Sequence, residues 1–167
     1  LRAENRISDL GNSVYFLDMP RALFCSVFLL AGTLFAQDAA QPPLPAVTLG
    51  IGTKSVAAEV ADEGPERTAG LMFRERLAPD SGMLFVMPRP ERAMFWMKNT
   101  RIPLSIAYIN ASGVILEIHD LEPHNENAVQ SAFPNIAYAL EMEQGWFARN
   151  RILPGDRIRG LPAPGGR

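Results

Sequence analysis

A candidate ligand site is centred on three adjacent polar residues in an otherwise apolar stretch: Lys98, Asn99 and Thr100. They supply an ammonium, an amide and a hydroxyl group. Such groups can frame a pocket for a small polar or anionic ligand. The full candidate site comprises Arg67, Trp96, Lys98, Asn99, Thr100 and Glu141. The same stretch also fits a strand that enters a turn, because Asn tolerates left-handed backbone and Lys98 can extend over Trp96. Ligand binding and packing therefore stay open as alternatives, with Trp96 and Met97 expected in the core.

Glu141 lies between Leu140 and Met142, in a segment that alternates apolar residues with small or polar ones. The alternation predicts a strand, with a helix as the alternative. A carboxylate on such a strand either faces water or needs a partner when it is buried. We expect Arg67 or Lys98 to be that partner.

Methionine and histidine supply a second kind of chemistry. The methionines that follow the N-terminal apolar segment are Met72, Met83, Met87, Met94, Met97 and Met142, and the histidines are His119 and His124. Thioether and imidazole ligands would suit copper in an exported protein, because its monovalent ion prefers soft ligands. Most of these methionines, however, lie in apolar runs, where methionine fills gaps in a core. Copper binding is therefore an alternative function, and we expect neither a metal site nor a cofactor.

A base and several carboxylates come together in one segment of the sequence, which contains Glu117, His119, Asp120, Glu122 and His124. A carboxylate could orient a histidine there, with Ser112 or Ser131 as the nucleophile. Neither a Gly-x-Ser-x-Gly elbow nor a His-Glu-x-x-His pair occurs in the sequence. A solvated, charged loop is the favoured interpretation of this segment.

The elements that must position these side chains come after a segment that has the form of an export signal. Residues 19–36 join a short basic start to an apolar run that ends in Ala36. This is the pattern of a secretory signal peptide, and the run is shorter than the roughly 20 residues of a membrane span. Cleavage after Ala36, or after Ala39 or Ala40, would release a chain in the periplasm or outside the cell. The expected division is an upstream mis-start or disordered extension (1–18), a signal peptide (19–36), a linker (37–45), one β-rich domain (46–161) and a tail (162–167).

Composition limits the functions that this chain can have. Its 167 residues suit a single domain, and 16 Lys+Arg against 18 Asp+Glu leave a net charge of -2. Without a basic block, nucleic acid is not an expected partner. Cys25 is the only cysteine and would leave with the signal peptide, so the mature chain has no thiol for a disulfide or a nucleophile. After cleavage, no stable membrane span is expected.

Short apolar runs separated by Gly and Pro turns predict many short strands. The expected strands are 47–51, 55–61, 83–87, 93–97, 104–110, 114–118, 138–142 and 157–160, with a short helix at 62–70 and a helical turn from Gly145. Pro88 and Pro90 are expected to end the third strand. We therefore predict a mainly β fold: a compact antiparallel β-sandwich or jelly-roll-like domain with a few short helices.

Four separated blocks, in order, resemble a known family, the domain of unknown function 192 family. They are Arg67-x-x-Gly-Leu-Met-Phe-Arg74, Gly82-Met-Leu-Phe85, Phe95-Trp-Met-Lys-Asn-Thr-x-Ile-Pro-Leu104, and Leu140-Glu-x-x-x-Gly-Trp146 with Gly155-Asp156. The resemblance implies a compact β-rich, jelly-roll-like domain, frequently exported in bacteria, with no established activity. Ser105 departs from the family's motif, which usually has Asp after the Pro-Leu pair. A serine there could still accept a backbone hydrogen bond.

Together these features predict an exported binding or accessory module of the cell envelope. Its partner would be a small polar or anionic ligand, or another envelope protein. The first alternative is an enzyme that uses a Lys/Asn/Glu polar pocket, and the second is a periplasmic copper-binding protein.

Overall fold

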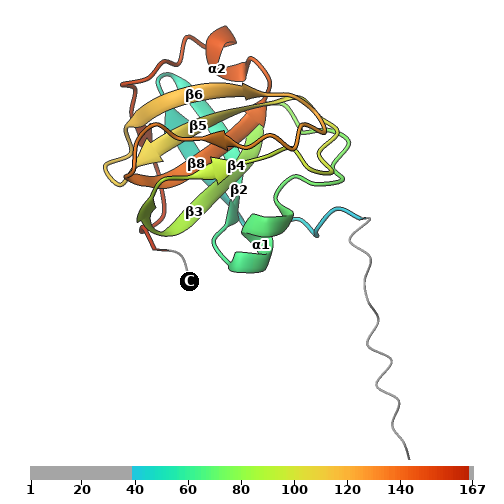
Figure 1. Ribbon diagram of the computed structural model, residues 1–167. Coiled ribbons are helices and arrows are strands. Elements are labelled where there is room, and N and C mark those ends of the chain that lie inside the picture. The colour runs from blue at the N-terminus through green and yellow to red at the C-terminus, as the bar shows by residue number, and fades with distance from the viewer. Residues whose placement is uncertain (1–38, 166–167) are drawn as a thin grey trace, which may run out of the picture. The chain divides into compact units, whose positions relative to one another are not determined.

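The computed structural model describes residues 39–165, so the expected signal peptide, Cys25 and the upstream extension lie outside the described residues. Two short helices and nine strands make up the domain (Figure 1). The strands are β1 (Ala46–Ile51), β2 (Lys54–Ala61), β3 (Ser81–Glu91), β4 (Met94–Phe95), β5 (Leu104–Asn110), β6 (Ile115–Leu121), β7 (Val129–Gln130), β8 (Ile136–Glu143) and β9 (Ile158–Arg159). The helices are α1 (Gly64–Ala69) and α2 (Trp146–Arg149).

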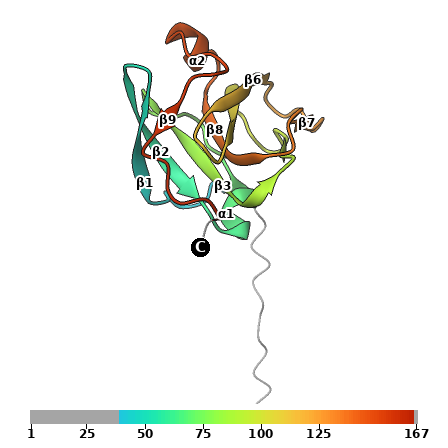
Figure 2. The same ribbon diagram turned by 90° about the vertical axis from the view of Figure 1, so that its left-hand side faces the viewer.

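Seven strands form one sheet in the order β6-β5-β8-β3-β2-β1-β9, and β4 pairs with β7 in a second, two-stranded sheet. The prediction of a mainly β fold with short helices is confirmed. The prediction of a purely antiparallel arrangement is wrong, because β2 and β3 run parallel. The 19 residues 62–80 between them include α1 and provide the long crossover that parallel neighbours require. Instead of two stacked sheets, the large sheet curls into a half-barrel (Figure 2).

The two terminal strands of the large sheet approach each other at one end. Val114, just before β6, forms a bridge with Arg157, just before β9. The amide of Ile115 donates to the carbonyl of Asp156 at 2.9 Å. The amide of Ile158 donates to the carbonyl of Gly113 at 2.8 Å. These contacts hold the curl of the sheet.

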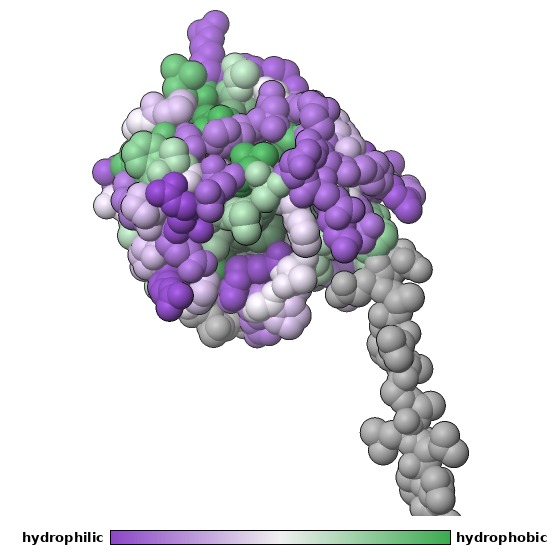
Figure 3. All heavy atoms as spheres, viewed as in Figure 1, coloured by the Kyte–Doolittle hydropathy of each residue, from purple (hydrophilic) through white to green (hydrophobic). Residues whose placement is uncertain are grey.

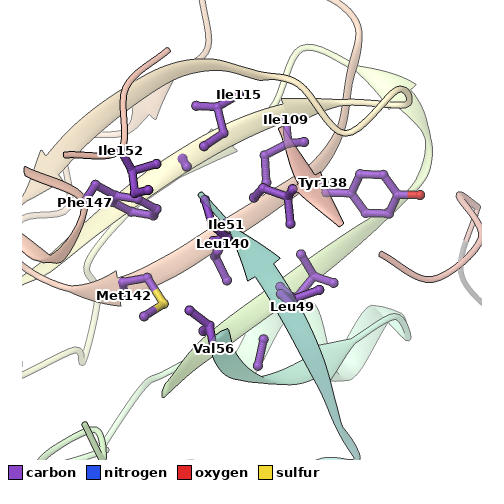
Figure 4. Packing of buried hydrophobic residues seen from close by; sticks show 14 of the residues in the cluster. Leu49, Ile51, Val56, Ile109, Ile115, Tyr138, Leu140, Met142, Phe147 and Ile152 are labelled. Atoms are coloured by element: carbon purple, nitrogen blue, oxygen red, sulfur yellow. The ribbon is translucent and has the colours of Figure 1, made fainter. Parts of the chain in front are cut away.

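The central strands are buried on both faces, so their alternating side chains enter two separate cores. Figure 4 shows the inner core, where side chains of β1, β2, β5, β6, β8 and α2 meet. In β8, Leu140 and Met142 join this inner core. Ala139 joins a second cluster on the opposite face, the outer core, which also contains Met83, Phe85, Ile106 and Tyr108. Glu141 therefore points to the outer face.

Most of the expected strands are confirmed. β1 and β2 form the predicted hairpin, β5 and β6 form another, and 136–143 is a strand and not a helix. The expectation that Pro88 ends the third strand is wrong, because β3 continues to Glu91. Its pairing with β8 shifts register between Val86 and Glu91. Such an irregularity accommodates prolines, which cannot donate to the sheet.

The short helix α1 begins where the sequence predicts it, with Pro65 in its first turn. The Glu66 carboxylate reaches back to accept the amides of Asp62 and Glu63 at 3.1 and 3.0 Å. The side-chain amide of Gln41 donates to the carbonyl of Gly70 at 2.8 Å, so this part of the expected linker lies against the domain. Within residues 39–165, no helix is long and apolar enough to cross a membrane.

Candidate functional site

A cavity of about 580 Å³ opens on the outer face of the large sheet. Its lining comes from α1 and the residues after it, from the second half of β3, from the 92–96 segment and from Thr100 and Glu141. Figure 3 shows apolar side chains in a hollow on the face that carries β4, bordered by hydrophilic ones. Four residues of the candidate site line this cavity: Arg67, Trp96, Thr100 and Glu141.

Glu141 lies among apolar neighbours from the two adjoining strands. In register it pairs with Met83 of β3 and Ile106 of β5, and both of those side chains are fully buried in the outer core. The strands are held close: a Cβ at Gly82 would lie 2.2 Å from the Glu141 carbonyl oxygen, so a larger residue would force β3 and β8 apart. The backbone of Glu141 is therefore held tightly against β3, and its side chain leaves the sheet among apolar neighbours.

The Glu141 side chain is only 4% exposed and forms no hydrogen bond or ion pair with any residue in the described part of the chain. Burial disfavours its charged form and raises its pKa from 4.5 to about 8. The expected partnership with Arg67 or Lys98 is wrong. Arg67 Nη1 donates instead to the carbonyls of Asp62 and Val86, and the Lys98 ammonium lies 5.6 Å from the centre of the Trp96 ring.

Lys98 and Asn99 do not line the cavity. Asn99 has φ 55°, and its carbonyl accepts the amide of Phe73 at 2.8 Å. The Thr100 hydroxyl donates to the Lys98 carbonyl at 3.2 Å. These contacts are the ones expected if this stretch forms a turn. Lys98, Asn99 and Thr100 therefore shape the chain beside the cavity, and of the three only Thr100 lines the cavity.

An aromatic wall completes the cavity, and two of its residues, Phe85 and Phe95, were missed by sequence reasoning, whereas Trp96 was among the candidates. The Phe85 and Phe95 rings meet edge to face with centroids 4.9 Å apart. Trp96 is 49% exposed and lines the cavity, so its expected place in the core is wrong, whereas Met97 is buried as expected. The available signal for Phe85 was strand alternation, because it lies two residues from Met83 and shares the face of Glu141.

Tyr108 packs on the same outer face but does not donate a hydrogen bond to Glu141. Its hydroxyl donates to the Val129 carbonyl at 2.6 Å, which ties β5 to β7. Burial, followed by the charges of Glu141 and Glu117, raises the pKa of this phenol far above its ordinary value of 10.0. Tyr108 therefore stays neutral and keeps its donor on the backbone.

The catalytic candidates of the 117–131 region are occupied in structural contacts. His119 Nε2 pairs with Glu117 at 2.8 Å, not with Asp120, whose carboxylate accepts the Ser105 hydroxyl at 2.5 Å. The Ser131 hydroxyl accepts the Ala93 amide at 3.0 Å and donates to the Phe133 carbonyl at 2.8 Å. Neither histidine lines the cavity. None of these contacts forms a nucleophile and base pair.

Metal ligands are dispersed. Among residues 39–165 no three His, Cys, Asp or Glu side chains are grouped so that they could hold a metal ion. Met72, Met87 and Met94 line the cavity, Met87 being also part of the core, whereas Met83, Met97 and Met142 are buried in the cores and do not line it. The cavity therefore offers thioethers without imidazole.

Ser105 keeps the structural role expected of it. It is 1% exposed, and its hydroxyl accepts the Gly145 amide at 2.8 Å while donating to Asp120. The two bonds connect β5 to β6 and to the start of α2. Serine thus satisfies a backbone donor at the position where the family usually has Asp.

The chain is a mainly β, single-domain protein with a ligand-sized cavity on the outer face of its sheet. Residues 47–160 match the model of the DUF192 family, described as "Uncharacterized ACR", and the chain belongs to this family. The resemblance in the four sequence blocks is thereby confirmed. A search of the curated proteins finds no match.

Two solved structures are similar to this chain over almost their whole length. One is a protein of Sinorhizobium meliloti 1021 proposed to be a transcription regulator, with 35% identity, a TM-score of 0.69, and coverage of 72% of this chain and 97% of that one. The other is a protein of unknown function from Novosphingobium aromaticivorans DSM 12444, with 33% identity, a TM-score of 0.66, and coverage of 77% and 99%.

Proposed function

We propose that this chain is an exported small-ligand-binding module of the cell envelope, with its ligand in the outer-face cavity. One observation carries the proposal: a cavity of about 580 Å³ has at its base a buried carboxyl group with no partner in the described part of the chain. Ligand sites are typically clefts of about 300–1,000 Å³ with apolar walls and a few placed polar groups. A buried polar group left unpaired is costly, which favours a role for it in binding.

Export is supported by the 19–36 segment, and the net charge of -2, without a basic block, gives no support to nucleic-acid binding by this chain. Expression of the chain from Met19 onward in a Gram-negative host tests export. We expect a periplasmic product whose N-terminus follows Ala36, Ala39 or Ala40. An unprocessed cytoplasmic product would contradict it.

A thermal-shift screen of small molecules tests ligand binding. A ligand present at 100 times its Kd adds about 2.7 kcal/mol to the stability of the folded state. Thr68, an exposed residue of α1, lines the cavity, and Ala148, an exposed residue of α2, does not. We expect Thr68→Trp to abolish the stabilisation and Ala148→Trp to leave it intact. Equal stabilisation of both variants would show that the ligand binds elsewhere.

Enzymatic proton transfer is a second candidate function. Glu141 has a pKa near 8 inside a cavity, and a carboxylic acid that stays protonated at neutral pH can act as a general acid. The Lys and Asn of the predicted polar pocket do not line the cavity, so this acid would act with Arg67 and Thr100 as neighbours. If a ligand is turned over, Glu141→Gln should abolish turnover; unchanged turnover in this variant would exclude the acid role.

A further inference from the structure

Resting on the proposed function, we propose that the cavity recognises a protonated amine carried on an apolar body, and that Glu141 is the residue that receives the ammonium group. This inference names the ligand class and replaces the polar or anionic ligand expected from the sequence with a cationic one. It follows from the empty acceptor, from the walls around it and from the charges that line the cavity.

The acceptor is empty because the donors that are seen bonded around the cavity give their hydrogens to backbone carbonyls and not to Glu141. Arg67 Nη1 bonds to the carbonyls of Asp62 and Val86. Arg92 Nη1 bonds to those of Ser131 and Ala132 at 2.7 and 2.8 Å. The Tyr108 hydroxyl bonds to the Val129 carbonyl. No residue in the described part of the chain pairs with Glu141, so the place beside its carboxyl is open to a ligand cation.

The walls suit an ammonium group on an apolar body. Phe85, Phe95 and Trp96 contribute aromatic rings, whose faces attract cations. The chain itself shows this preference, since the Lys98 ammonium lies 5.6 Å from the Trp96 ring centre. Met87 and Met94 add polarizable, adaptable surface for the apolar part of the ligand.

The charges that line the cavity balance once Glu141 ionises. Arg67 and Arg92 carry two positive charges, and Glu91 and Glu141 then carry two negative ones. A ligand cation thus meets no net positive field. A ligand anion at the base of the cavity would meet the like charges of Glu91 and of ionised Glu141.

Binding of an ammonium group is coupled to the loss of a proton from Glu141, whose pKa is about 8 in the empty protein. The titratable and charged groups around this carboxyl are Tyr108 of β5 and three residues that line the same cavity: Arg67 from α1, Glu91 at the end of β3 and Arg92 just after it. Tyr108 stays neutral, because the pKa of its phenol lies far above its ordinary value. Affinity for the amine should therefore rise about tenfold per pH unit below the pKa of Glu141 and level off above it.

The experiment titrates the mature domain with three matched probes: phenethylamine, 2-phenylethanol and 3-phenylpropionate. Binding is followed by NMR shifts or calorimetry from about pH 6 to about pH 9, a range in which a primary amine stays mainly protonated. The variants are Glu141→Gln and, as a matched control with the same charge change, Glu91→Gln, because Glu91 also lines the cavity but is partly exposed. Cooperative unfolding of each variant verifies its fold.

We expect phenethylamine to bind best, with the pH dependence given above. Glu141→Gln should weaken phenethylamine binding at least about tenfold near pH 8.5, a loss of about 1.4 kcal/mol or more. It should also remove the pH dependence of binding. Glu91→Gln should change phenethylamine binding less than about threefold. Tighter binding of the alcohol or the acid, or amine binding that ignores Glu141→Gln, overturns the inference and leaves cavity binding in place. If neither these probes nor the screened molecules bind, the proposed function fails as well.

Discussion

The two faces of β8 differ in kind. Leu140 and Met142 enter an inner core made only of apolar side chains and closed by the curl of the sheet. Glu141, between them, enters an outer face that carries a cavity and an unpaired carboxyl group. Adjacent residues of one strand thus have different roles. The inner face stabilises the fold, and the outer face is less stabilising because it carries a site.

Truncation of the inner face should have the largest effect. Leu140→Ala removes buried side-chain atoms from a fully packed core, so we expect it to lower the free energy of unfolding by about 2–5 kcal/mol. Urea denaturation measures the change. Leu140→Met, which nearly preserves volume, is the control and should cost less than about 1.5 kcal/mol. A comparable loss for both variants would argue against close packing of this face.

The outer face should make stability depend on pH. The folded-state pKa of Glu141, about 8, lies above its unfolded value of 4.5, so the folded chain binds the extra proton between these values. The free energy of unfolding should therefore fall as pH rises through this window, by up to about 1.4 kcal/mol per pH unit, and level off above it. Denaturation of wild type and Glu141→Gln across the window isolates this contribution. Parallel curves for the two proteins would contradict it.

Replacing the unpaired group should stabilise the empty protein. Glu141→Met keeps the approximate length of the side chain and removes a buried acceptor that has no partner among residues 39–165. We expect about 1–3 kcal/mol of added stability at neutral pH, together with loss of amine binding. Chemical denaturation and the phenethylamine titration measure the two effects. Destabilisation would show that the carboxyl contributes to the fold, and the contrast between the faces would then be wrong.

The smallest effect is expected at the polar turn beside the cavity. Lys98→Ala removes a cation over an exposed Trp96 ring and should cost no more than about 0.5–1 kcal/mol. Ligand affinity should stay within about twofold of wild type, whereas Trp96→Ala should weaken it, because Trp96 lines the cavity and Lys98 does not. A loss of ligand affinity in Lys98→Ala would show that this lysine takes part in binding.

Local patterns were enough to place most strands, because alternation and Gly/Pro turns act within a few residues. Alternation also tells which side chains share a face, but not what covers that face. Trp96 illustrates the limit: β4 has only two residues and pairs with distant β7, so one side of the ring is left open. The environment of Glu141 likewise depends on α1 and the 87–96 segment, which line the same cavity although they are distant from Glu141 in the sequence. The parallel pairing of β2 with β3 had a usable signal in the length of its connection.

The bridge between Val114 and Arg157 has a consequence for how the chain behaves in concentrated solution. Terminal strands of an open sheet expose backbone donors and acceptors that can recruit another chain, and such recruitment leads to aggregation. Here the start of β6 and the segment before β9 use these groups on each other, and Arg157 and Arg159 place charges along the same margin. The curl that builds the inner core thereby also limits self-association.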